Sequence, residues 1–253
     1  MKLKYLTIAA LAMLTASGTA LAQKAGDNVV NVGWFHFTPQ DSSDPLQITG
    51  STILPPAFQG AVNQRLQNSG ARVDDADTAG LTFMHFFTDN ISAEVVLGVA
   101  PKFNLTGTGA LTAPDGQPLA SATQWSPAVL VKYYFGQAAD TWRPFVGLGA
   151  SYFFYSNINI HSNLQAMAAQ SLGGGQPTAF TTAKLKNSWA PVFNAGINYN
   201  IDKHWSMAFS VSYVPVSTTA TLTTSLPNGA ATVSQSKVRL NPVITFLSLG
   251  YTF

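Results

Sequence analysis

Residues that could carry out chemistry are few and widely spaced in this chain of 253 residues. Cysteine is absent, so the sequence offers neither a disulfide nor a thiolate metal site. Four histidines occur without the spacing that brings two metal ligands together on one helical turn: His36, His85, His161 and His204. We therefore expect no metal site, no cofactor and no enzyme activity, although a Ser and a His that meet across strands would escape detection in a sequence.

Glu94 and Lys132 are the charged residues whose positions suggest a specific interaction. Each stands within a strongly alternating segment, on the side that otherwise carries small residues. A lone charge in a narrow enclosed space is costly to bury, so it is expected to find a partner of opposite sign. We predict that Glu94 and Lys132, on neighbouring strands, form a buried ion pair or network.

Alternation of large apolar and small side chains dominates the sequence, and this period of two indicates β-strands. In "HWSMAFSVSYVPV" apolar residues occupy every second position from Trp205 to Tyr213, with Ser and Ala between them. Strands are predicted in eight segments, some with a less regular pattern: Val29–Thr38, Gly80–Asp89, Asn90–Pro101, Gln124–Phe135, Arg143–Ile160, Asn187–Ile201, His204–Val216 and Ile244–Phe253.

Short and long connections alternate between these segments. Those after the second, fourth and sixth are short, whereas the others are long and rich in Gly, Pro, Ser, Thr, Asn and Gln, with short helices expected in His161–Gly175 and Pro55–Gly70. In an antiparallel ring, this order places every tight turn at one end and every long loop at the other. We predict an all-β fold, a single eight-stranded antiparallel transmembrane β-barrel of the outer-membrane type over residues 23–253, with four long extracellular loops.

The low charge content indicates which face of the strands meets the solvent. Charged residues make up 9% of the chain, against roughly 25% in ordinary soluble domains. Large apolar side chains are therefore expected to face lipid and small ones to face the lumen. The alternative is a soluble sandwich or lipocalin-like barrel with its apolar faces inward, which would expose Ser, Ala, Asn and Gly faces almost without charge. Phe253, in the last strand, is expected to face lipid and to contact the barrel-assembly machinery.

The N-terminal segment has the features of a cleavable secretory signal. Lys2 and Lys4 precede an apolar stretch, and small residues end at Ala22. We predict a signal peptide over residues 1–22 and a mature chain that starts at Gln23. Without the two lysines, basic and acidic residues are equal in number, so a nucleic-acid partner is not expected.

Several blocks of the chain, in order, resemble the outer membrane protein W (OmpW) family, which includes the alkane-uptake barrels. The matching stretches are "LTFMHFFTDNISAEVVLGVAP", "KYYFG" followed by "WRPFVGLGASYFFYSN", "LKNSWAPVFNAGINYNIDKHWSMAFSVSYVPVSTTA" and "VRLNPVITFLSLGYTF". The loops depart from the family pattern, above all residues 40–78. The resemblance implies an eight-stranded barrel in the bacterial outer membrane whose narrow apolar channel admits small hydrophobic molecules and releases them sideways into the membrane.

The alternation also predicts which side chains line the lumen. Apolar residues are expected to line its outer half: Phe153, Tyr155, Val214, Leu240, Ile244 and Phe246, extended by Met84 and Phe86. Polar residues are expected to plug the lumen deeper in, among them Glu94, Lys132, Asn198 and Ser210. The alternative is that the inward aromatic residues simply fill the barrel as a core.

Prolines mark the outer ends of three strands. Pro127, Pro191 and Pro242 each remove a backbone donor where a strand begins. The loss of donors predicts looser pairing there, where a lateral opening would form. The plainer explanation is that prolines end strands at loop boundaries.

Two functions fit these features. The first is a passive outer-membrane channel for small hydrophobic solutes, with membrane lipid around it. The second is a structural or recognition barrel whose long loops meet phage, bacteriocins or host surfaces, without flux of its own. An apolar outer lumen favours the first.

Overall fold

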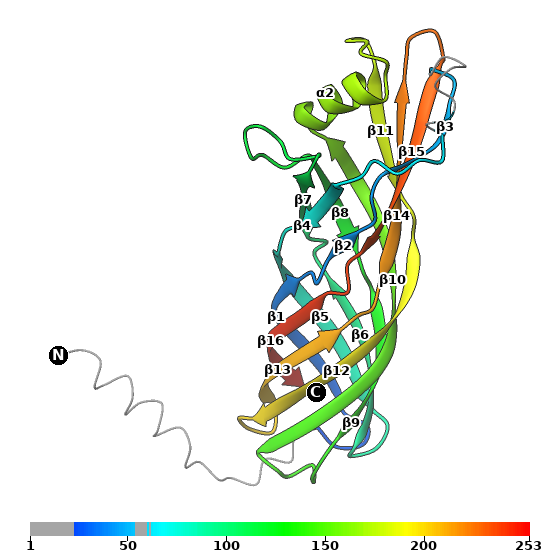
Figure 1. Cartoon of the computed structure of the whole chain (residues 1–253). Coiled ribbons are helices and arrows are strands. Elements are labelled where there is room, and N and C mark those ends of the chain that lie inside the picture. Colours follow the sequence, from blue (N-terminus) through cyan, green and yellow to red (C-terminus); the bar gives the residue numbers. More distant parts are fainter. Residues whose placement is uncertain (1–22, 54–59, 61) are drawn as a thin grey trace, which may run out of the picture.

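The computed structural model describes residues 23–53, 60 and 62–253. The signal peptide predicted for residues 1–22 lies outside these residues. Within the described residues, no helix is both long and apolar enough to cross a membrane. Strands account for most of the described chain (Figure 1).

Eight antiparallel strands form a closed barrel, which confirms the predicted fold. Their order around the ring is β12, β13, β16, β1, β5, β6, β9 and β10, and pairing of β10 with β12 closes it. Each of the eight strands pairs with a neighbour on both sides, so the ring has no edge strand, as a lipid environment requires. The barrel strands are β1 (Asn28–Thr38), β5 (Ala76–Phe86), β6 (Ile91–Gly98), β9 (Ala128–Tyr134), β10 (Trp142–Ile160), β12 (Ser188–Asn200), β13 (Trp205–Tyr213) and β16 (Val243–Thr252).

Strands within the four long connections continue the wall beyond the barrel (Figure 1). One group of strands runs β4, β7, β8 and β10, and a second joins β11, β14 and β15 with β2 and β3. We call this region the extension. It contains β2 (Ser42–Ser43), β3 (Gln47–Ser51), β4 (Ser69–Val73), β7 (Lys102–Gly109), β8 (Ala120–Trp125), α2 (Ser162–Ser171), β11 (Phe180–Leu185), β14 (Ser217–Ser225) and β15 (Ala231–Arg239).

The structure contains a short helix in one of the two segments where one was expected. Helix α2 falls within the expected segment His161–Gly175, at the far end of the extension (Figure 1). The N-terminal part of the other expected segment, Pro55–Gly70, lies largely outside the described residues.

The barrel is apolar outside, while its interior holds many buried polar and charged residues as well as apolar ones, unlike a soluble protein. On β9, for example, Val129 and Val131 are 56% and 57% exposed, while Lys132 on the same strand faces inward and is 6% exposed. Aromatic pairs gather at both ends of this apolar band, with Trp205 against Tyr251 at the turn end and Tyr152 against Trp189 at the extension end. Such aromatic girdles are typical of the two membrane interfaces. The soluble alternative therefore does not fit.

Candidate functional site

A cavity of about 400 Å³ occupies the half of the barrel that lies next to the extension. Its apolar lining comes from side chains that alternate inward on six barrel strands. Four of the expected lumen residues, Phe153, Val214, Ile244 and Phe246, line it. The other apolar lining residues of the barrel interior are Phe35, Phe37, Val96, Ala128, Leu130 and Val192.

Close packing of aromatic rings shapes one wall of the cavity. Phe35 on β1 stacks on Phe246 of β16 with a centroid distance of 3.9 Å. The neighbouring position on β5 is Gly80, where an added Cβ would lie 2.0 Å from the Phe35 ring. Because no side chain fits there, Gly80 leaves the space that the Phe35 ring occupies.

Four expected lining residues lie outside this cavity. Leu240 and Tyr155 line a second apolar cavity, of about 140 Å³, within the extension. Gln124 lines both cavities. Met84 and Phe86 point inward, but they lie in a separate cluster at the turn end of the barrel. The expectation that these two extend the outer lining was wrong about depth, because alternation determines the face of a strand and not how far along the barrel a residue lies.

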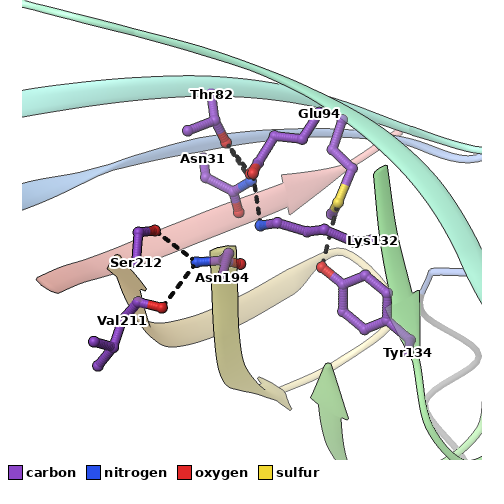
Figure 2. Close-up of polar contacts among 9 residues, drawn as sticks. Asn31, Thr82, Glu94, Lys132, Tyr134, Asn194, Val211 and Ser212 are labelled. Atoms are coloured by element: carbon purple, nitrogen blue, oxygen red, sulfur yellow. Dashed lines mark hydrogen bonds and ion pairs between the residues drawn. The ribbon is translucent and has the colours of Figure 1, made fainter. Parts of the chain in front are cut away.

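Polar residues form the floor of the main cavity (Figure 2). Lys132 Nζ lies 2.6 Å from Glu94 Oε2, and both side chains are buried. The hydroxyl of Thr82 donates to the other carboxylate oxygen of Glu94 at 2.9 Å, and Asn31 Nδ2 donates to the Thr82 hydroxyl at 2.9 Å. Lys132 Nζ also lies 4.6 Å from the centre of the Phe145 ring. The structure thus brings together the two charged residues that the sequence pairs.

Asn194 completes the floor on the opposite side (Figure 2). Its Nδ2 donates to the Ser212 hydroxyl at 2.9 Å and to the Val211 carbonyl at 3.3 Å. Ser210, an expected polar residue, lines the cavity on the same strand as Ser212. Alternation alone places Asn194 inward, but only the register of the strands reveals that it faces Lys132 across Gly147.

The turn end of the barrel is closed by a second polar group. Arg143 is fully buried, and it donates to the backbone carbonyls of Gln23, at 2.8 Å, and of Asp89. The expected residue Asn198 lies here rather than in the cavity floor, and its Nδ2 donates to Gln23 and to Asn200. The residue pattern does not single out Arg143, because its partners are backbone carbonyls, and a sequence does not reveal which carbonyls lie nearby.

The three prolines occupy different environments. Pro127 lines the cavity. Pro191 pairs with Ala150 inside the unbroken ladder of β10 and β12. The Pro242 carbonyl accepts a hydrogen bond from Val214 at 3.2 Å. Pro191 and Pro242 do not line the cavity. Of the three prolines, only Pro127 lies at an interruption of the barrel wall, between β6 and β9.

The interruption lies between β6 and β9. Their pairing ends at Val96 and Ala128, and pairing of the same two chain segments resumes at Lys102 and Thr123, in β7 and β8. The Gln124 backbone N–H still donates to the Pro101 carbonyl at 3.0 Å. Between that bond and Val96, Leu97–Ala100 and Trp125–Pro127 are not paired with each other, and both stretches line the cavity. We call this interruption the window.

Each side of the window is hydrogen-bonded to the strand on its far side, β5 for one side and β10 for the other. On one side, the Val99 backbone N–H donates to the Ala79 carbonyl at 3.1 Å; on the other, that of Tyr152 donates to the Pro127 carbonyl at 3.1 Å. Lipid-facing side chains, including Val99 at 67% exposed and Trp125 at 40%, are also part of the cavity lining. The cavity therefore reaches the outer face of the barrel.

Comparison with known proteins agrees with this architecture. The OmpW family model matches residues 46–253. Outer membrane protein W of Vibrio cholerae is 31% identical, covering 98% of this chain and 99% of that protein. Outer membrane protein AlkL of Ectopseudomonas oleovorans is 23% identical, covering 74% of this chain and 71% of that protein.

The solved structures show the same fold. The crystal structure of the outer membrane protein OprG from Pseudomonas aeruginosa superposes with a TM-score of 0.73 at 23% identity, covering 92% of this chain and 99% of that one. These relatives are outer-membrane barrels and not enzymes. The chain is an outer-membrane β-barrel, and it belongs to the OmpW family.

Proposed function

We propose that this barrel lets small hydrophobic molecules pass from the outside into the cavity and then sideways through the window into the lipid. One observation carries the proposal: the same cavity is lined by buried residues such as Phe153 and by lipid-facing residues such as Val99. An apolar molecule could leave such a cavity without entering water, because its surface stays against apolar groups throughout. The likeness to AlkL supports this function.

The other exits are less suited to an apolar molecule. The floor presents the Glu94–Lys132 ion pair, and the turn end is filled by Met84, Phe86 and the fully buried Arg143. Passing straight through would require the solute to disrupt charged and hydrogen-bonded groups, which is costly in a low-dielectric interior. The second cavity, which shares Gln124 with the first, is suited to be the entry from the extension.

A pair of engineered cysteines tests the exit. The chain has no cysteine of its own, so Val99→Cys and Ser126→Cys can be joined across the window by a short, cleavable thiol reagent. We expect uptake of radiolabelled octane by cells to fall at least about fivefold on cross-linking and to recover on cleavage. The matched control joins Val95→Cys to Val129→Cys, which already lie opposite each other in the paired wall, and should leave uptake unchanged.

Unchanged uptake with the window cross-linked would refute the lateral exit. If octane uptake were the same with and without the barrel, the recognition barrel would become the better interpretation. The contact of Phe253 with the barrel-assembly machinery stays a prediction. In the structure Phe253 is 61% exposed, and its backbone N–H donates to the Asn28 carbonyl at 2.9 Å.

A further inference from the structure

The cavity floor contains an acceptor that the protein does not use. Asn194 is 8% exposed, and both described bonds of its side chain come from Nδ2. Its Oδ1 is buried and has no hydrogen-bond partner among the described residues. An amide oxygen accepts up to two hydrogen bonds, and leaving a buried one empty is unfavourable. Asn194 therefore presents an unfilled acceptor at the cavity.

A donor with remaining capacity lies beside this acceptor. Lys132 Nζ carries three hydrogens, and its ion pair with Glu94 leaves hydrogens for a further acceptor. Lys132 and Asn194 flank Gly147 in one row of the sheet. A Cβ on Gly147 would lie 3.0 Å from Lys132 Cγ and 3.4 Å from Asn194 Oδ1. Because Gly147 has no side chain, the space between Lys132 and Asn194 stays open.

The charge of this floor selects the kind of group that fits. Glu94 balances Lys132, so the pair has no net charge. A carboxylate would have to compete with Glu94 for Lys132, and an ammonium would have to compete with Lys132 for Glu94. A hydroxyl is uncharged and both accepts and donates, which matches an ammonium on one side and an amide oxygen on the other.

We propose that the cavity binds straight-chain primary alcohols, with the hydroxyl accepting from Lys132 Nζ and donating to Asn194 Oδ1. The alkyl chain then lies along Phe153, Val192 and Val214 towards the window. This inference rests on the proposed function and names a solute class for it: a molecule apolar along its length with a neutral polar end. An alkane fits the same apolar wall but leaves the floor unfilled.

The test measures binding to the folded, full-length barrel in lipid nanodiscs. The probes are 1-octanol, octane and octanoate, compared at equal mole fraction in the bilayer. The reporters are the ¹³C-methyl resonances of Val192, Val214 and Ile244, which line the cavity. We expect 1-octanol to bind about tenfold more tightly than either octane or octanoate, since it alone gains both hydrogen bonds without displacing a charge.

Two variants remove the hydroxyl site in different ways. Asn194→Leu deletes the acceptor at nearly constant volume, and Gly147→Ala places a methyl group between the two partners. Each should bring 1-octanol to within about twofold of octane. Asn200→Ala is the matched control, because Asn200 is a buried inward-facing amide on the same strand that lies outside the cavity. This control should keep the full preference for 1-octanol.

The outcomes separate this inference from the proposed function. Equal binding of octane and 1-octanol to the native barrel would refute the hydroxyl site, with water then the simplest partner for Asn194, and would leave the proposed function standing. Tightest binding of octanoate would also refute it, because Lys132 would then be recognising an anion. If none of the three probes shifts the methyl resonances, both proposals fail.

Discussion

At the scale of single residues, the ion pair of Glu94 and Lys132 is costly to bury in the lumen. Both charges are taken out of water, and the loss of solvation is offset by their contact at 2.6 Å, by the hydrogen bond from Thr82 and by the Phe145 ring 4.6 Å from Lys132 Nζ. Removing one partner from such a pair is typically worse than removing both, because an unpaired buried charge is left behind. The pair should therefore behave as a unit.

Substitutions at this pair should be strongly non-additive. We expect Glu94→Gln alone, or Lys132→Met alone, to lower the free energy of unfolding by about 3–5 kcal/mol, and the double variant to lower it by clearly less than the larger single effect. The measurement is guanidinium unfolding of the barrel in detergent micelles, followed by tryptophan fluorescence. Additive losses would mean that the two side chains act independently.

How far the sequence predicts the site can be judged from individual residues. Alternation gives the inward face, so it finds Phe153, Ile244 and the charged pair. It does not give depth, which depends on how far each strand is shifted against its neighbour. That is why Met84 lies at the turn end of the barrel. Asn194 illustrates the same limit, because its importance comes from Lys132 two strands away in the ring.

At the scale of elements, the extension is the largest departure from the sequence-based expectation. The connection between β13 and β16 was expected to be a long loop, yet it forms the hairpin of β14 and β15. Its signal was present: an Asn-Gly turn, with Gly229 at φ +86°, follows a run rich in Thr. A weak local strand tendency becomes a strand here because the barrel strands below supply a template in register.

One ion pair joins strands of the extension that lie far apart in the chain. Arg239 donates to both carboxylate oxygens of Asp44, at 2.7 and 3.4 Å. This hydrogen bonding from Arg239 holds the pKa of Asp44 below its ordinary value of 3.8. Because the pKa is lowered on folding, the stabilisation is present above the unfolded pKa and is lost as pH falls through the lower folded pKa.

Acid should therefore loosen this part of the extension. We expect the hydrogen-exchange protection of the Asp44 amide, which donates to the Lys237 carbonyl at 2.9 Å, to decrease progressively below about pH 4. In Asp44→Asn the protection should already be reduced at pH 7 and should no longer change in this range. Equal pH dependence of both proteins would show that another group is responsible.

At the scale of the whole molecule, the apolar outer surface fixes where the barrel sits. Large apolar residues such as Val131, at 57% exposed, cover the strands between the two aromatic girdles. The sequence predicted this arrangement well, since a period of two together with few charges leaves lipid as the only suitable surroundings for that face. The strand count and the closure of the ring were predicted for the same reason.

The cost of a charge on this surface should depend on depth. Val131 lies midway between the aromatic residues Trp125 and Phe135 of the same segment. We expect Val131→Arg to destabilise the barrel folded in lipid bilayers by about 2–4 kcal/mol, and Phe135→Arg to destabilise it by about 0–1 kcal/mol. Guanidinium titration in large unilamellar vesicles measures both. Equal effects at the two positions would contradict the assigned position of the lipid band.

The seam between β1 and β16 has a consequence for how the barrel is made. Its hydrogen bonds join Asn28–Thr38 to Val243–Thr252, stretches that about two hundred intervening residues separate. The first strand is therefore synthesised well before its final partner. Until the last strand is made, the unpaired edge of the first strand can pair with β-strands of other chains, so it needs protection by a chaperone. A chain whose synthesis stops before the last strand would keep this edge unpaired and would be prone to aggregate.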